Sequence, residues 1–147
     1  MDNLALRKEE YREFKVFALV TAGIKSNVQR IGVNRAGSLE REGVFETLGT
    51  INVIVLTNAS LSEGALARGI ITLTKAEVIT LEDLDIRSSY NPEIRGTGTD
   101  NAITVSGEGS RINYLSGHSK MGELMVMAVA SAVKEAIFKQ NGINCHD

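Results

Sequence analysis

The chain has 147 residues, of which 43% are hydrophobic and 23% are charged, the composition of a globular domain large enough to bury a core. Its formal net charge is −2 and the two signs are interleaved along the chain, which argues against a nucleic-acid-binding surface. Because no apolar stretch is long enough to span a bilayer, no signal peptide is evident and the single Cys145 cannot form an internal disulfide, we expect a cytoplasmic protein without a membrane partner.

The first third of the chain predicts a helix, a strand and a long irregular connection. Asn3–Phe14 is charged and free of glycine and proline, which favours a short amphipathic helix. Lys15–Thr21 is almost wholly apolar and rich in β-branched and aromatic residues, which predicts a strand covered on both faces. Residues 22–49 show no sustained period, apart from room for one helical turn within 37–45, and a connection of this length is usually functional or mobile.

A second strand and a helix follow. Ile51–Thr57 is again a buried-strand pattern, and Ser60-Leu-Ser-Glu63 is typical of a capping box with Ser60 as the N-cap. We expect the helix to extend to about Val78. Gly64 and Gly69 lie inside it at a cost of about 1 kcal/mol each relative to alanine, which favours close packing of the helix on a sheet over room for a bulky ligand.

The last third predicts a hairpin and a long helix. Residues 80–99 are irregular, Asn101–Ser106 is a third strand, and a glycine-containing turn leads to Arg111–Leu115 as its antiparallel partner. The final helix should begin after Ser119 as N-cap and end at Asn141-Gly142. Its core-facing residues recur at positions i, i+3, i+4 and i+7, namely Met121, Leu124, Met125, Ala128, Val129, Ala132, Val133, Ala136 and Ile137.

This order of elements predicts a single α/β domain over residues 1–147. Its sheet should be mixed and mainly four-stranded, with helices packed against it. The second strand, the helix that follows it and the third strand fit a parallel crossover. The hairpin partner would add an antiparallel edge.

Polar, glycine-bearing segments lie at the ends of the predicted strands, where ligands of open α/β sheets tend to bind. They are Thr21–Asn27, Thr57-Asn58, Arg95–Asn101 and Gly117–Glu123. Gly96-Thr-Gly-Thr-Asp100 combines a permissive backbone with hydroxyls and a carboxylate, but it matches neither a P-loop nor a dinucleotide fingerprint. Taken alone, this segment favours a structural turn.

The start of the last helix places His118 and Lys120 beside amides that favour negative charge. Imidazole exchanges protons readily near neutral pH, so His118 is a candidate proton donor. The alternative is structural: Ser119 caps the helix, Glu123 complements its dipole and His118 is a surface residue. Cys145-His146 is a poor metal pair and no zinc or nucleophile-elbow motif occurs, so we expect no metal site.

Taken together and in order, the polar and strand segments resemble the adenosylcobinamide amidohydrolase family. The resemblance covers residues 16–137, and the region before its first strand is short for that family. The segments that carry it are Leu19–Gly23 with Ser26-Asn27, Gly49–Thr57, Ala65-Leu66, Thr74–Ala76, Asp85–Ser89, Gly96–Asn101 and Gly117–Glu123.

The resemblance implies hydrolysis of the amide that joins the aminopropanol arm to the corrin ring of adenosylcobinamide, giving adenosylcobyric acid. The cobalt-containing corrinoid would be the substrate, with no further cofactor. On this basis Asp100 or Glu123 is the candidate base for water and His118 the proton donor, with a threonine or serine nucleophile as a variant. The candidate substrate contacts are Ser26, Asn27, Asn52, Thr97, Thr99, Asn101, Ser119 and Lys120.

Two other interpretations stay open at this point. The chain is also compatible with a corrinoid-binding module that does not hydrolyse its ligand, or with an oligomeric structural subunit. A homodimer is expected in either case, because the apolar last helix or an exposed edge strand can serve as an interface.

Overall fold

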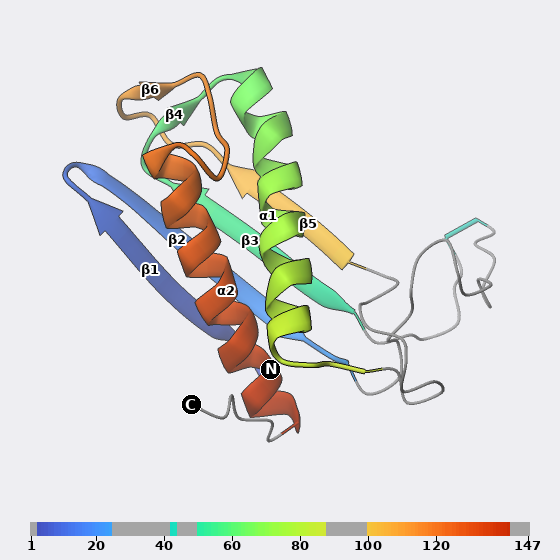
Figure 1. The fold of residues 1–147 in the computed structure, drawn as a ribbon. Coiled ribbons are helices and arrows are strands. Elements are labelled where there is room, and N and C mark those ends of the chain that lie inside the picture. Colours follow the sequence, from blue (N-terminus) through green and yellow to red (C-terminus); the bar gives the residue numbers. More distant parts are fainter. Residues whose placement is uncertain (1–2, 25–41, 44–49, 88–99, 142–147) are drawn as a thin grey trace.

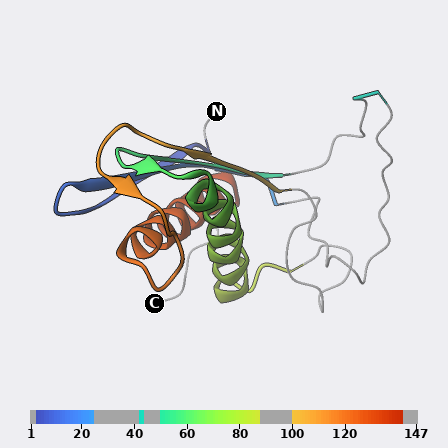
Figure 2. The same cartoon turned by 90° about the horizontal axis from the view of Figure 1, so that it is seen from above.

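Two helices cover one face of a four-stranded sheet in the computed structural model, which describes residues 3–24, 42–43, 50–87 and 100–141 (Figure 1). Seen from above, both helices lie on the same side of the sheet (Figure 2). The predicted α/β class is confirmed. The elements in chain order are β1 (Ala5–Tyr11), β2 (Phe14–Ala22), β3 (Ile51–Thr57), β4 (Ser60–Leu61), α1 (Glu63–Asp83), β5 (Asp100–Val105), β6 (Arg111–Ile112) and α2 (Lys120–Asn141).

The sheet is mixed, as predicted, with the strand order β1-β2-β3-β5. Its first three strands are joined antiparallel, whereas β3 and β5 are parallel. Their register pairs Ile51 with Asp100 at one end and Leu56 with Val105 at the other. The chain returns between these two strands through α1, so the predicted crossover is present. The predicted irregular segments, including the turn within 37–45, lie mostly outside the described residues.

The N-terminal segment is a strand, and the predicted helix at Asn3–Phe14 is wrong. Strand β1 pairs with β2 along its whole length, and Arg12 turns the chain with a φ of 54°. Helix propensity is a weak preference, and a continuous ladder of hydrogen bonds to β2 overrides it. In β2 itself, buried residues alternate with partly exposed ones, so this strand is covered on one face and not on both as predicted.

Helix α1 begins two residues later than predicted. Ser62, not Ser60, is its N-cap, because the Ser62 hydroxyl accepts a hydrogen bond from Ala65 N at 3.2 Å while Ser60 and Leu61 form β4. The helix also continues beyond Val78 to Asp83. The prediction of close packing is confirmed at Gly69, where an added Cβ would lie 3.2 Å from Thr104 Oγ1, and it is wrong at Gly64, where a Cβ would meet no atom within 4 Å.

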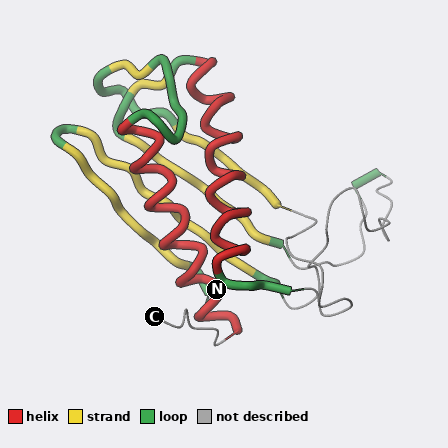
Figure 3. Tube along the Cα trace, viewed as in Figure 1, coloured by secondary structure: helices red, strands yellow, loops and turns green. Residues whose placement is uncertain are grey.

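The predicted antiparallel hairpin after β5 is also wrong. Arg111 and Ile112 form β6, which pairs parallel with β4 in a separate two-stranded sheet beside the start of the helices (Figure 3). The intervening turn is bound to the end of β3 and not to β5, because Gly107 N donates to Ala59 O and Gly109 N to Asn58 O, each at 2.8 Å. Strand β5 therefore remains at the edge of the main sheet.

The core lies between the sheet and the two helices, and the predicted apolar stripe of α2 is buried. Ser119 caps α2 as predicted, because its hydroxyl accepts from Gly122 N at 3.2 Å, and the helix ends at Asn141. The same hydroxyl donates to Ser116 O at 2.8 Å, which folds the preceding turn against the helix. Gly122 permits this close approach, because a Cβ there would overlap the carbonyl oxygen of Ser116.

We expect Gly122→Ala to lower the free energy of unfolding by about 1–3 kcal/mol, the usual cost of overpacking a well-packed site. The added methyl group must displace the backbone at Ser116. Urea unfolding followed by circular dichroism measures the loss. Gly117→Ala is the matched control, since a Cβ there meets no atom within 4 Å, and equal stabilities of the two variants would contradict the prediction.

Candidate active site

The described residues that the sequence nominates for function fall into two groups at opposite ends of β3. Asp100 lies beside Ile51 at the start of the strand, whereas the Thr57 hydroxyl at its end donates to Met121 Sδ in the first turn of α2, at 3.9 Å. A strand of this length spans about 20 Å. The structure therefore does not bring Asp100 and His118 into one cleft, contrary to the expectation. Ser26, Asn27, Thr97 and Thr99 lie outside the described residues.

A row of polar side chains crosses three strands at the Asp100 end. Asn52 Nδ2 donates to Thr21 Oγ1 at 3.2 Å, and Asn101 Nδ2 donates to Asn52 Oδ1 at 3.1 Å. These residues are neighbours in the sheet register and lie on the face that the helices leave uncovered. The structure thus brings together Asn52 and Asn101, both nominated from the sequence, and adds Thr21 to them.

A carboxyl pair lies at the same strand ends, on the helix-covered face. Alternate residues of β5 share a face, so Asp100 points to the same side as Thr104, which packs against α1. There Asp100 is hydrogen-bonded to Glu77 of α1. Glu77 is only 2% exposed, while Asp100 at the edge of the sheet is exposed. Among the described residues, Glu77 Oε1 has no hydrogen-bond partner.

The burial of Glu77 determines its protonation. Loss of hydration, followed by the charge of Asp100 and the hydrogen bond with it, raises the pKa of Glu77 from 4.5 to about 8. Glu77 is therefore mainly the neutral acid at pH 7. A carboxylic acid that keeps its proton at neutral pH beside a second carboxyl group is an arrangement that enzymes use for acid–base chemistry.

Glu77 is not among the residues nominated from the sequence, although its position carries a signal. Leu73 and Leu81 lie four residues before and after it and are buried, so the helical period already assigns Glu77 to the core-facing side of α1. An acidic residue on the buried face of a helix is rare unless it is paired. The identity of its partner, Asp100, depends on the crossover and is not visible in the local pattern.

At the other end of β3, the polar residues that begin α2 have structural partners. Lys120 Nζ forms an ion pair with Glu123 Oε2 at 2.6 Å and lies 5.1 Å from the centre of the Tyr11 ring. The Ser119 hydroxyl caps the helix and accepts a hydrogen bond from Gly122 N. His118 is exposed, and its backbone amide donates to Ser116 Oγ at 3.3 Å. These contacts favour the structural interpretation of this segment.

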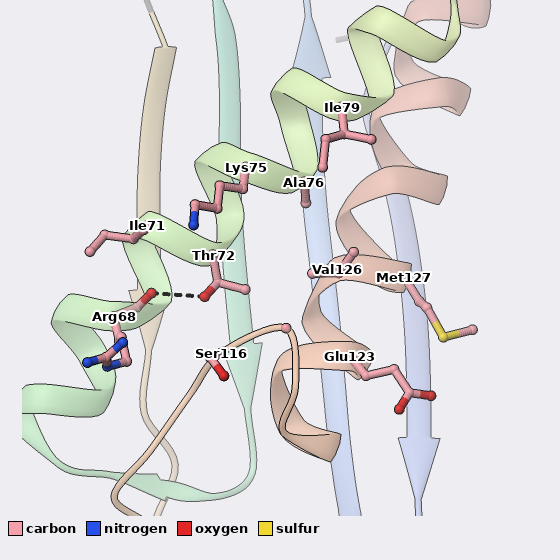
Figure 4. Close-up of a pocket in the computed structure, with 11 residues that line it drawn as sticks. Arg68, Ile71, Thr72, Lys75, Ala76, Ile79, Ser116, Glu123, Val126 and Met127 are labelled. Carbon is pink, nitrogen blue, oxygen red and sulfur yellow. Dashed lines mark hydrogen bonds between the residues drawn. The ribbon is translucent and has the colours of Figure 1, made fainter.

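A cavity of about 370 Å³ lies between α1 and α2 (Figure 4). Ile71 and Ile79 of α1 and Met127 of α2 contribute apolar surface, and Arg68 and Glu123 add charge. Of the residues nominated as catalytic, Glu123 lines this cavity, whereas Asp100 and His118 do not. The cavity is therefore separate from the carboxyl pair.

Within residues 3–24, 42–43, 50–87 and 100–141, no three His, Cys, Asp or Glu side chains are grouped so as to hold a metal ion. Neither of the helices in these ranges combines the length and apolar character needed to cross a bilayer.

The fold and the carboxyl pair define a small α/β protein with a buried acid where two parallel strands begin. The sequence matches the adenosylcobinamide amidohydrolase family over residues 1–145, and the chain belongs to this family. The resemblance recognised in the sequence is thereby confirmed over nearly the whole chain. Membership in a family of amidohydrolases supports a hydrolase in broad terms.

One relative is an uncharacterised protein of Methanocaldococcus jannaschii, which is 45% identical over 158 aligned residues. The match includes 97% of this chain and 61% of the relative. The chain thus spans about three fifths of the length of the curated relative that it matches.

We expect Glu77→Gln to flatten the pH dependence of stability. The pKa of Glu77 is about 8 in the folded protein against 4.5 as its ordinary value, so the folded state retains a proton that the unfolded state releases. The stabilisation from Glu77 is full below the lower value and is lost as the pH rises through the higher one. The free energy of unfolding of the wild type should therefore fall more steeply than that of the variant between about pH 5 and pH 9.

Urea unfolding at a series of pH values tests this expectation. Glu82→Gln is the matched control, because Glu82 is an exposed glutamate on the same helix and its substitution should leave the slope unchanged. Parallel curves for the wild type and Glu77→Gln would show that Glu77 holds no extra proton in the folded state.

Proposed function

We propose that the protein is a cytoplasmic amidohydrolase of corrinoid salvage, which hydrolyses the aminopropanol amide of adenosylcobinamide to adenosylcobyric acid without a further cofactor. Family membership supports the reaction class and the corrinoid substrate. The observation that carries the proposal is the contact between buried Glu77 and exposed Asp100. Among the described residues, this pair combines a solvent-accessible carboxylate with a neighbouring acid held in its neutral form.

Hydrolysis of an amide needs a base for water and an acid for the departing amine. In the proposed reaction Asp100 accepts a proton from water as the water oxygen bonds to the carbonyl carbon. Asp100 then returns this proton to the nitrogen as the carbon–nitrogen bond breaks. The products are a carboxylic acid and the amino alcohol, so the atoms balance with water as the only co-reactant.

Glu77 supports Asp100 from the protein interior. As a neutral acid it donates a hydrogen bond to the Asp100 carboxylate, which orients this group toward the substrate. If both groups were ionised, two negative charges would repel each other in a poorly hydrated setting. Glu77 is thus a positioning residue, and Asp100 is the group that reaches the substrate.

The polar row formed by Thr21, Asn52 and Asn101 supports substrate binding near the same strand ends. Side-chain amides donate and accept hydrogen bonds, which suits a ligand that itself carries amide side chains. Ser26 and Asn27 follow β2 closely in the chain, and Thr97 and Thr99 shortly precede Asp100. Their role as substrate contacts therefore remains part of the proposal.

The residues at the start of α2 have a smaller part in this proposal than in the sequence-based hypothesis. Glu123 is the less favoured base, because it already forms an ion pair with Lys120. His118 would have to act from the far end of β3, so the proton for the amine is assigned to Asp100.

Incubation of the purified protein with adenosylcobinamide should yield adenosylcobyric acid, detected by mass spectrometry. Asp100→Asn should lower kcat by about 10²–10⁴-fold, the usual contribution of a general base. The amide cannot accept the proton of water, although it keeps the shape of the side chain. Glu108→Gln, at an exposed glutamate beyond the opposite end of β5, should retain the wild-type rate.

Two outcomes would overturn parts of this proposal. A change in the corrinoid absorption spectrum without product would indicate a binding module. Full activity of Asp100→Asn, with product formed by the wild type, would retain the reaction and reject the carboxyl pair as its centre.

A further inference from the structure

Helix α1 is apolar on two sides, and one of these faces solvent. Its inner side carries buried residues such as Leu73 and Leu81. Its outer side carries two pairs of exposed branched aliphatic residues, Ile70-Ile71 and Val78-Ile79, with Ile71 57% and Ile79 56% exposed. A helix that is apolar on both sides is normally buried on both, and a contiguous exposed apolar patch usually marks an interaction site.

This outer surface is also hollowed. A shallow groove of about 440 Å³ is lined by Ile70, Ile71, Thr74, Lys75, Val78 and Ile79. It shares Ile71, Lys75 and Ile79 with the cavity between α1 and α2, and these three residues lie on successive turns of α1 (Figure 4). The two hollows therefore adjoin along this row of residues, and together they offer apolar surface to the side chains of a partner.

The apolar residues are arranged symmetrically along the helix. About a point midway between Thr74 and Lys75, Ile70 corresponds to Ile79 and Ile71 to Val78. When two copies of a helix pack antiparallel about a two-fold axis, the residues related in this way face each other. Apolar residues would then meet apolar residues along the contact.

One pair of opposite charges, Arg68 and Glu82, favours the same arrangement. Arg68 is exposed near the start of the helix, whereas Glu82 and Asp83 are exposed at its end. Antiparallel packing places Arg68 of one copy near Glu82 of the other, while parallel packing would bring like charges together. Lys75 lies close to the axis, where its flexible stem lets the ammonium group reach solvent.

We propose that two copies of this chain associate through α1, packed antiparallel about a two-fold axis between Thr74 and Lys75. The occupant of the groove is thus the α1 outer face of a second copy. This inference rests on the exposed face of α1 and does not depend on the proposed hydrolysis.

Sedimentation velocity over about 1–100 µM protein tests the dimer, since this range brackets the affinity of ordinary homodimers. The wild type should sediment as a dimer, and Ile71→Glu with Ile79→Glu should raise the dimer Kd at least about 100-fold, because two glutamates from each copy would be desolvated. Both residues are more than half exposed, so the monomer should keep its fold and its circular dichroism spectrum.

The uncovered face of the sheet supplies the matched control. Ile103 on β5 is 53% exposed, so Ile103→Glu places a glutamate in a similarly exposed apolar setting and should leave the dimer intact. A monomeric wild type at every concentration would overturn the proposal. A dimer that Ile103→Glu dissociates, and that Ile71→Glu with Ile79→Glu does not, would assign the interface to the sheet and equally overturn it.

A charge reversal tests the orientation. Arg68→Glu should weaken the dimer about tenfold, because it places two acidic side chains opposite each other, and Glu82→Arg in the same chain should restore the affinity. Restoration supports antiparallel packing. Failure of the second substitution to restore the dimer would contradict the proposed orientation.

Discussion

Strands β3 and β5 lie parallel and in register, which obliges the chain to cross back between them through α1. The packing of Gly69 against Thr104 sets the position of α1 along the strands of the sheet. From Gly69, eight residues of helix advance about 12 Å to Glu77. From Thr104, four residues back along β5 cover about 13 Å to Asp100. The two carboxyl groups therefore meet because of a close contact one strand length away. Burial, and after it the nearby Asp100, raises the pKa of Glu77.

The two-sided character of α1 connects the candidate active site with the proposed dimer. Its inner side holds Glu77 against Asp100, and its outer side presents Ile71 and Ile79 about two turns apart. Because only one face of the sheet is covered by helices, α1 also forms the outer layer of the molecule at this place (Figure 2). A partner packed on the outer side would restrict the same turns that hold Glu77. Helix α1 would then both hold the carboxyl pair in place and form the dimer interface.

The sequence predicted those elements whose local pattern agrees with their final surroundings. Strands β3 and β5 and helix α2 were placed within a residue or two, because apolar strand runs and a helical stripe directly reflect one buried side. The helix predicted for the N-terminal segment was wrong, since a charged sequence that pairs only with β2 carries no strand signal of its own. The cap of α1 moved to Ser62 because the pairing of β4 with β6 uses Ser60 as a strand residue. In each failure a contact distant in sequence overrode the local preference.

For the candidate site, the sequence by itself determined the family and nominated Asp100, Asn52 and Asn101, because ordered polar segments can be recognised without coordinates. It also gave the helix cap at Ser119, which depends on neighbouring residues alone. Only the tertiary structure paired Asp100 with Glu77 and separated it from the start of α2. The physical reason is that helix packing fixes which side chains meet across the fold, and the residues that meet are far apart along the chain.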